Sequence, residues 1–375
     1  MQRIALVYDW LDSAGGAERI LKVFSEMYPE ADWYTLVYDP EHASFLPKTT
    51  VHTSFLQKLP HAKRFRPFLA PLMPIAWEQF SFDSYDIVIS ITSGYAKGLL
   101  LKPHTKHFCY LLTPPRYLWT HTNEYLRDYF NGWKTLFRPL AQLLFSYLKT
   151  WDYAAAHRPD VIIPISEVVK KRVQTLYKDK VHCHDVIYPP VDYQFWSAAA
   201  SDTPTANLAR KPRIQSKGYA LVVARLVPYK RLDYAILACQ SIQMPLVLVG
   251  DGPDMTRLKQ MAAQTTHFVG NISDEALRDL YAHALVTLCP GIDDFGLTAV
   301  ESMAAGTPAI VHSSSGNAEA VLDSETGYCV ELAGPHELAD AVVRTQERQW
   351  SRTKCQRRAK EFDIAACISQ WKELV

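Results

Sequence analysis

The first half of the chain alternates short apolar runs with stretches in which apolar residues recur every three or four positions. Ile4–Tyr8 is the first run, the glycine-containing turn Asp12–Gly16 follows it, and Ala17–Tyr28 has helical periodicity. Further buried-strand candidates are Trp33–Val37, Asp86–Thr92, His107–Leu112 and Val161–Ile165. Continuous apolar runs separated by helices predict a parallel sheet that is covered on both faces.

The pattern is interrupted at residues 197–217 and then resumes. The interruption is rich in small, polar and basic residues, as expected of a linker. Beyond it, strands are expected at Tyr219–Ala224, Leu246–Val249, Leu285–Cys289 and Ala309–Val311. Helices are expected at Leu232–Gln240, Met255–Ala263, Asp274–His283 and Thr298–Ala305. We therefore predict a Rossmann-like N-terminal domain (1–196), a linker (197–217), a second Rossmann-like domain (218–354) and a C-terminal helical segment (355–375).

Length and composition agree with two globular α/β domains. The chain has 375 residues, of which 48% are hydrophobic and 21% charged. Its formal net charge of +1 gives no reason to expect a nucleic-acid partner. The start of the chain lacks the pattern of a signal peptide, no apolar run is long enough to span a membrane, and seven scattered cysteines suggest reduced thiols. We therefore expect a cytoplasmic protein.

Metal and nicotinamide sites are not predicted. The tract His182-Cys183-His184 lacks a second ligand pair at metal-site spacing, and Asp251-Gly-Pro-Asp254 is typical of a turn that caps a helix. Neither half has the G-x-G-x-x-G pattern of a dinucleotide-binding dehydrogenase. No metal and no other cofactor are therefore expected.

Two charged stretches follow predicted strands of the second half. Arg225 and Lys230 come after the first strand, where a guanidinium, an ammonium and a helix N-terminus can bind a diphosphate together. Asp293 and Glu301 surround the start of a later helix, where carboxylates suit sugar or ribose hydroxyls. Taken one at a time, these stretches are equally compatible with a solvated basic turn and with acids that interact with a helix dipole.

In combination the motifs resemble the donor-binding half of the family 4 retaining glycosyltransferases, which have the GT-B architecture. The matching pieces, in family order, are ARLVPYKRLD (224–233), LVGDGPD (248–254), VGNISDEALRDLYAHA (269–284) and PGIDDFGLTAVESMAAGTPAI (290–310). The resemblance implies two Rossmann-like domains that face each other across a cleft, with a C-terminal helix that crosses back to the N-terminal domain. It also implies metal-independent transfer from a nucleotide-sugar donor.

The resemblance assigns roles to particular residues. Arg225 and Lys230 would bind the donor diphosphate and act in catalysis with Asp293, the acid that would contact the transferred sugar. Glu301 would contact the ribose. The backbone amides expected to complete the donor cradle are those of Phe295, Gly296, Leu297 and Thr298, together with the loop glycines Gly15 and Gly16. Asp293 stands where the family usually has Glu, which is one methylene longer.

A segment in the first half concerns the acceptor. The run Tyr110–Trp119 resembles the H-T-P-x-R-Y-x-W element of a mannosyltransferase-like subgroup that acts on glycan or lipid-linked acceptors, frequently with GDP-mannose. The residues expected on the acceptor side are Arg116, Tyr117, Trp119 and His121. The usual His is replaced by Leu112 and the Asp that often follows the Trp by Thr120. The alternative interpretation of this segment is a packed surface loop.

Two further stretches, 55–77 and 125–151, interleave Lys and Arg with aromatic residues and leucine. Such surfaces suit shallow contact with an anionic membrane at its inner face, although these aromatics are equally suited to a helix-packing core. The function predicted from the sequence is transfer of a sugar, with mannose from GDP-mannose as the specific expectation. The alternatives are a UDP-sugar donor, a relative that cleaves or epimerises nucleotide sugars, and a protein that binds a sugar nucleotide without turnover.

Overall fold

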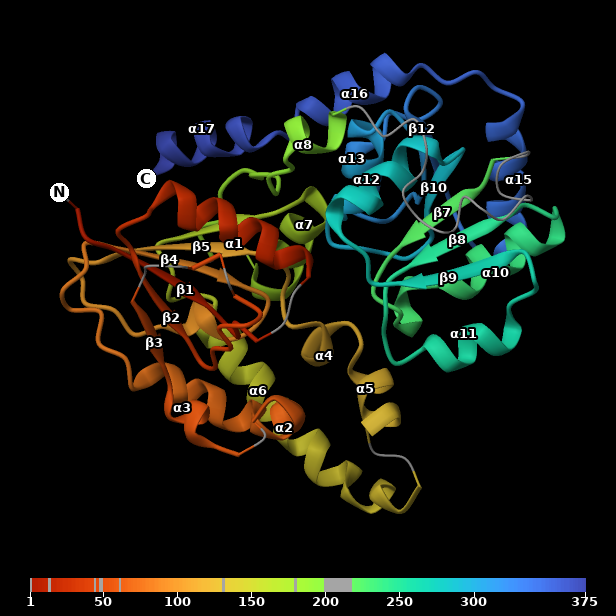
Figure 1. Ribbon diagram of the computed structural model, residues 1–375. Coiled ribbons are helices and arrows are strands. Elements are labelled where there is room, and N and C mark those ends of the chain that lie inside the picture. The colour runs from red at the N-terminus through yellow and green to blue at the C-terminus, as the bar shows by residue number, and fades with distance from the viewer. Residues whose placement is uncertain are drawn as a thin grey trace. The chain divides into compact units, whose positions relative to one another are not determined.

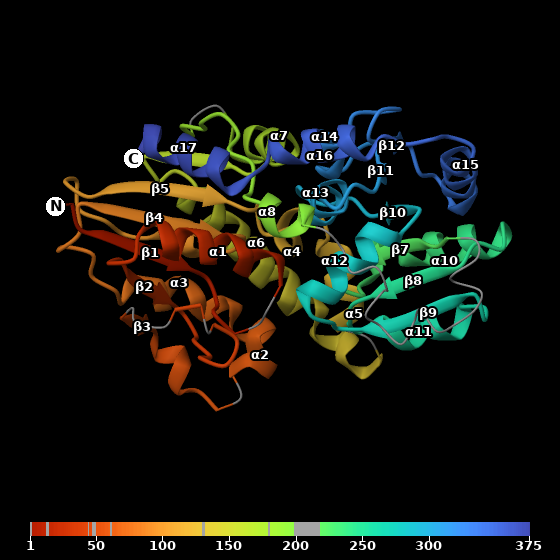
Figure 2. The same ribbon diagram turned by 45° about the horizontal axis from the view of Figure 1, so that its top comes forward.

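A computed structural model of the chain describes residues 2–12, 15–43, 45–46, 50–60, 62–129, 132–178, 181–198 and 218–375. These residues form two compact units, Met1–Ile187 and Tyr188–Val375, each built on its own sheet (Figures 1 and 2). Most of the predicted linker, residues 199–217, lies outside the described residues.

The first unit contains a six-stranded parallel sheet in the order β3-β2-β1-β4-β5-β6. Its strands are β1 (Ile4–Tyr8), β2 (Asp32–Thr35), β3 (Val51–Thr53), β4 (Ile87–Thr92), β5 (Lys106–Leu111) and β6 (Val161–Pro164). All six residues of β4 are buried, as its mostly apolar sequence predicts for a central strand.

Seven α-helices are described in this unit: α1 (Gly16–Met27), α2 (Ala62–Leu69), α3 (Met73–Glu78), α4 (Arg116–Trp119), α5 (Thr122–Tyr129), α6 (Arg138–Ala155) and α7 (Glu167–Tyr177). Short 3₁₀ turns occur at η1 (Phe55–Lys58), η2 (Ala70–Leu72), η3 (Ala96–Gly98) and η4 (Gly132–Phe137). Ala62 of α2, Met73 of α3 and Leu148 of α6 belong to one buried cluster with residues of β1 and β4. Both aromatic stretches of the sequence therefore supply part of this core.

The second unit repeats the design with the order β12-β11-β10-β7-β8-β9. Its strands are β7 (Ala220–Val223), β8 (Leu246–Val249), β9 (Thr266–Gly270), β10 (Val286–Cys289), β11 (Ala309–His312) and β12 (Gly327–Val330). Its helices are α8 (Tyr193–Ser197), α10 (Leu232–Ser241), α11 (Met255–Met261), α12 (Asp274–His283), α13 (Leu297–Ala304), α14 (Asn317–Ala320), α15 (Pro335–Gln346), α16 (Arg352–Lys360) and α17 (Ile364–Leu374). Residues 355–375 thus comprise the end of α16 and all of α17.

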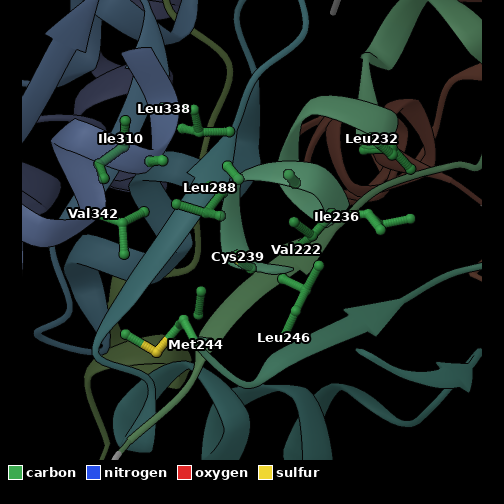
Figure 3. Close-up of a cluster of buried hydrophobic side chains, with 14 of the residues drawn as sticks. Val222, Leu232, Ile236, Cys239, Met244, Leu246, Leu288, Ile310, Leu338 and Val342 are labelled. Atoms are coloured by element: carbon green, nitrogen blue, oxygen red, sulfur yellow. The ribbon is translucent and has the colours of Figure 1, made fainter. Parts of the chain in front are cut away.

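One buried cluster joins this second sheet to α10 and α15. Figure 3 shows its members, among them Val222 and Leu288 from the strands, Ile236 from α10 and Val342 from α15. Each of these four side chains is at most 1% exposed. Burial of apolar surface stabilises a fold by about 25 cal/mol per Å², so this cluster contributes strongly to the stability of the second unit.

The predicted fold class is confirmed, because both units are doubly wound parallel α/β structures. In each sheet the strand order reverses beside the first strand of the unit, between β1 and β4 and between β7 and β10. Ligands of such sheets bind beyond the carboxyl ends of the strands at this reversal. The loops after β1, β4, β7 and β10 are therefore the places to look for a site.

The helices and the cysteines have properties that matter for membrane contact and for reactivity. None of the described helices combines the length and the hydrophobicity needed to cross a bilayer.

All seven cysteines are free thiols, five of them buried and two half-buried. Burial raises the thiol pKa values of Cys183, Cys329 and Cys355 to about 11 and those of the other four to about 12.

Candidate functional site

The charged residues predicted for the second half gather at the reversal of its sheet. β7 and β10 are parallel neighbours, so the loops at their carboxyl ends emerge side by side. Arg225 and Lys230 follow β7, and Asp293 follows β10. The structure therefore brings the loops that carry Arg225, Lys230 and Asp293 to the same edge of the sheet, although these residues are up to 68 positions apart in the sequence.

Arg225 lies in the exposed loop after β7 and has no polar partner among the described residues. Its side chain is exposed, and no hydrogen bond or ion pair to another described residue satisfies it. The turn that carries it packs closely against the loop after β8: a Cβ at Gly250 would lie 2.0 Å from the carbonyl oxygen of Ala224. The same turn is held by the hydrogen bond from Leu226 N to Asp251 O, 2.9 Å. A fixed backbone thus presents an unpaired guanidinium to solvent, as an anion site requires.

Lys230 contacts the carboxylate of Asp293. Its Nζ lies 2.5 Å from Asp293 Oδ1, and the side chains are 22% and 14% exposed. Lys230 ends η7 (Pro228–Lys230), and the next residue, Arg231, has a left-handed backbone at φ 51°. That turn directs the chain into α10. The ammonium is therefore placed between the carboxylate and the exposed side of the loop, where an anionic ligand would compete for it.

The loop after β11 fixes Asp293 from the other side. Asn317 Nδ2 donates to Asp293 Oδ2 over 3.2 Å, and Asp293 N donates to Ser315 Oγ over 2.9 Å. Sequence reasoning overlooked Ser315 and Asn317. Their signal was available, because they follow the strand predicted at Ala309–Val311, which is the neighbour of the strand before Asp293. Loops after neighbouring parallel strands emerge at the same edge of a sheet, so the loop after β11 lies beside the loop after β10 that carries Asp293.

The start of α13 supplies backbone donors beside these side chains. Gly296 precedes the helix with φ 86°, a left-handed conformation that favours glycine, and Leu297 and Thr298 form its first turn. Amides of a first helical turn lack intrahelical acceptors and suit phosphate or hydroxyl oxygens. The ring of Phe295 is 2% exposed and packs on Tyr188 at 5.3 Å, so only the backbone of this residue is available to a ligand.

Glu301 lies deeper than the sequence suggested. It is 4% exposed, and its Oε2 accepts a hydrogen bond from the Tyr281 hydroxyl at 3.0 Å. Tyr281 in turn packs edge-on against Trp196 of α8 at 5.7 Å. The carboxylate is thus part of a buried polar contact between α12 and α13, and its predicted ribose contact has to be made from a largely enclosed position.

In the first unit, Gly15 and Gly16 begin α1 directly after β1. Gly15 is the N-cap residue with an extended backbone, φ −175°, so its conformation does not demand glycine. Burial raises the pKa of the Glu18 carboxyl, and hydrogen bonds from the backbone N–H groups of Glu18 and Gly15 oppose that rise. Glu18 thus caps this helix start, and Gly16, the first residue of the helix, is exposed.

The residues predicted on the acceptor side lie in and next to α4, after β5. Tyr117 packs among the rings of Tyr95, Tyr125 and Phe145, and burial raises its pKa well above the usual value. His121 Nδ1 lies 2.7 Å from Thr120 Oγ1. Because the ring of Tyr117 packs against these three rings, it holds α4 in place.

Trp119 is tied to a buried ion pair. Its Nε1 donates to Asp152 Oδ2 over 2.8 Å, and Tyr177 Oη donates to the same oxygen over 2.7 Å. The other oxygen of Asp152 pairs with Lys97, and both of these charged side chains are 0% exposed. Lys97 Nζ also donates to the carbonyl oxygen of Gly94 over 2.7 Å. The network joins α4, α6, α7 and the loop after β4, which explains why the Trp119 indole points inward.

Asp9, another residue that sequence reasoning overlooked, organises the reversal of the first sheet. Its carboxylate accepts hydrogen bonds from Thr92 Oγ1 (2.7 Å) and from the backbone N–H groups of Ser93, Tyr95 and Ala96 (2.9–3.0 Å). Four donors satisfy the hydrogen-bonding capacity of this buried carboxylate within the fold. It fixes the loop after β4 against the end of β1.

The chain is similar to known protein families over the part that carries this site. Residues 205–362 match the model of the family described as glycosyl transferases group 1. The matched range contains Arg225, Lys230, Asp293 and Glu301, together with the loop that carries Asn317.

Similar curated proteins match over part of their length. An uncharacterized glycosyltransferase of Methanocaldococcus jannaschii is 28% identical over 204 residues, 52% of each chain. A GDP-mannose-dependent alpha-(1-6)-phosphatidylinositol monomannoside mannosyltransferase of Mycobacterium tuberculosis is 31% identical over 156 residues, 37% of this chain and 40% of the relative. The corresponding dimannoside mannosyltransferase of that organism is 38% identical over 134 residues, 34% of each chain. The chain thus matches about half or less of the length of these relatives.

Solved structures agree over the whole chain. Anabaena HepE, determined in complex with UDP, has a TM-score of 0.70 at 17% identity over 99% of both chains. Sucrose-phosphate synthase from Thermosynechococcus elongatus has a TM-score of 0.72 at 19% identity over 100% of this chain and 98% of that one. At these identities the likeness establishes the fold.

Proposed function

The chain belongs to the group 1 glycosyl transferases of GT-B fold, and from this premise we propose that it transfers mannose from GDP-mannose, with retention, to a hydroxyl of a glycan or lipid-linked glycan in polysaccharide biosynthesis. The observation that carries the proposal is the convergence of Arg225, Lys230 and Asp293 with the first turn of α13 at the reversal of one sheet. Two cations and helix amides suit a diphosphate, and the carboxylate beside them suits a sugar hydroxyl.

The choice of GDP-mannose is supported by the relatives. The two mycobacterial proteins are described as GDP-mannose-dependent mannosyltransferases. These two relatives match only 34–37% of this chain. The identity of the donor is therefore proposed here and is to be tested by experiment. Arg225 and Lys230 would bind its diphosphate, Glu301 its ribose, and Asp293 the mannose.

The proposed reaction follows from the charges at the site. The bond between the anomeric carbon and the diphosphate oxygen breaks, and the acceptor oxygen bonds to the same face of that carbon. The acceptor proton passes to the departing phosphate oxygen. Arg225, Lys230 and the amides of Leu297 and Thr298 would stabilise the charge that develops on the diphosphate, the part played elsewhere by a metal ion. We propose that the chain has no resident metal.

We further propose that the acceptor is held at the inner face of a membrane, with the protein in the cytoplasm. η4 and α6 leave large apolar side chains exposed, among them Leu136 (82%), Leu140 (66%) and Leu143 (68%). No Asp or Glu occurs between residues 41 and 78 or between 128 and 152, whereas Lys and Arg occur in both stretches. Exposed apolar side chains in stretches that carry Lys and Arg but no Asp or Glu favour contact with anionic lipid.

The proposal is tested by binding and turnover with a panel of donors. Thermal shifts and product formation are measured with GDP-mannose, UDP-glucose and ADP-glucose, first with the unaltered chain and then with Arg225→Ala. We expect stabilisation and transfer with GDP-mannose that the variant loses. Stabilisation by a UDP-sugar instead would show that the donor is not GDP-mannose. Binding without turnover would indicate a non-catalytic protein, and no binding of any sugar nucleotide would refute the donor site.

A further inference from the structure

Asp293 is held by four described residues, and three of them are consecutive: two in the loop between β11 and α14, and Asn317, the first residue of α14. Besides the bonds to Asn317 and Ser315, Gly316 N donates to Asp293 O over 2.9 Å. The fourth is Lys230, on Oδ1. Both the backbone and one carboxylate oxygen of Asp293 are therefore held by a loop to which the sequence-based prediction gave no role.

Among these partners, Lys230 is the one that a donor would withdraw. An ammonium that faces a doubly charged diphosphate gains more from it than from one carboxylate, so Lys230 is expected to turn away from Asp293 when a nucleotide diphosphate binds. With Lys230 engaged elsewhere, the side-chain donor that remains to the Asp293 carboxylate among the described residues is the amide of Asn317.

The surroundings of Asn317 allow this one orientation. The side chain is 0% exposed and its Nδ2 is shared between Asp293 Oδ2 and Ser315 Oγ, each at 3.2 Å. Its Oδ1 has no hydrogen-bond partner among the described residues and lies against Gly296, where an added Cβ would come within 1.8 Å of it. Rotating the amide would bring its oxygen against the carboxylate oxygen. The contact with Asp293 is therefore maintained although it leaves a buried carbonyl oxygen unpaired, which is unfavourable.

Resting on the proposed function, we infer that Asn317 is the positioning residue for Asp293: its amide, seated on the Ser315 hydroxyl, keeps the carboxylate directed at the transferred sugar when Lys230 moves to the diphosphate. The shorter acid matters here. Asp293 has one torsion fewer than Glu, so a single donor from the neighbouring loop is enough to fix its direction. The β11–α14 loop then determines how the sugar is held, whereas the nucleotide is held by other residues.

The first test separates sugar from nucleotide. Calorimetry measures the Kd of GDP and of GDP-mannose for the unaltered chain, for Asn317→Ala and for Ser314→Ala, an exposed neighbour in the same loop. We expect Asn317→Ala to weaken GDP-mannose about tenfold and to lower kcat, with the Kd of GDP within twofold. Ser314→Ala should match the unaltered chain. Equal binding and turnover in Asn317→Ala, or equal losses for GDP and GDP-mannose, would overturn the inference.

The second test uses pH and keeps the shape of the side chain. Asn317→Asp places two carboxylates about 3 Å apart, which cannot both ionise readily, so they share a proton at low pH. The protonated acid donates as the amide does, and GDP-mannose affinity should be restored at low pH and fall at least tenfold as the pH rises. The unaltered chain should show no such dependence, and a variant equally flat across pH would overturn the inference. If the unaltered chain binds neither GDP nor GDP-mannose, the proposed donor itself is wrong.

Discussion

Arg225 is the residue whose replacement should most cleanly separate binding from folding. It is exposed and has no described partner, so Arg225→Ala should change the free energy of unfolding by less than about 0.5 kcal/mol. Loss of a charge-assisted pair should weaken GDP binding by about 10- to 100-fold. Urea titration and calorimetry measure the two effects. Arg357→Ala, an exposed arginine of α16, is the control and should change neither quantity.

Glu301 calls for the opposite expectation. Glu301→Ala removes the buried acceptor of the Tyr281 hydroxyl and should destabilise the fold by about 1–3 kcal/mol. Glu301→Gln retains an acceptor oxygen, so it should unfold within about 1 kcal/mol of the unaltered chain while binding the nucleotide less tightly. Denaturation curves of both variants check this. Equal stability of the alanine variant would mean that the Tyr281 contact contributes nothing.

His107 should make stability depend on pH. Burial lowers its pKa to about 4 from an ordinary value of 6.5. The folded chain therefore binds fewer protons than the unfolded chain between these values, and stability falls as the pH drops from 6.5 towards 4. The loss from this residue reaches about 3 kcal/mol. Urea titrations from about pH 7 to about pH 4 should show the decline, and His107→Gln should flatten it. An unchanged slope in the variant would assign the effect to other groups.

The sequence was sufficient to predict the site residues that directly follow a recognisable strand. Arg225, Lys230 and Asp293 follow apolar runs, and the carboxyl ends of parallel strands meet at one edge of a sheet. The burial of Glu301 and the inward direction of Trp119 could not be predicted in this way. They depend on Tyr281 and Asp152, which other parts of the fold bring into contact.

At the scale of elements, the buried pair of Lys97 and Asp152 holds the loop after β4, α4, α6 and α7 together. Lys97→Met would leave the carboxylate without its counter-ion in the interior, and we expect a loss of about 3–5 kcal/mol in the free energy of unfolding. Lys102→Met is the matched control, because its ion pair with Asp83 is more than half exposed and should contribute little to the free energy of unfolding. Similar losses in the two variants would show that the buried pair has no special weight.

The strands that the sequence left undetected lie at the edges of the two sheets. β3, β9 and β12 each lie at the edge of a sheet and include half-buried residues, so they lack a continuous apolar run. The central strands β1, β4, β7, β8 and β10 were predicted because both of their faces are covered and their sequences are mostly apolar. Edge strands obtain their conformation from a neighbour, which a local pattern does not record.

At the scale of the whole molecule, a net charge of +1 conceals a separation of charge along the chain. If the acid-free stretch around α6 contacts lipid, the double change Leu140→Ser and Leu143→Ser should reduce partitioning onto anionic vesicles about tenfold or more. Sedimentation with vesicles containing phosphatidylserine measures this, with neutral vesicles for comparison. Leu322→Ser, which alters an exposed leucine of the second unit, should leave partitioning unchanged. No difference between the variants would exclude this surface.

The seven enclosed cysteines also give the protein a practical property. Thiolates react with maleimides and thiols do not, and every native thiol has a pKa of about 11 or 12. A cysteine introduced at an exposed position such as Ser314 would therefore be modified first at neutral pH, with no native cysteine removed. A fluorophore attached there would report on the β11–α14 loop as donor is added, and a second attached at Leu136 would report on lipid.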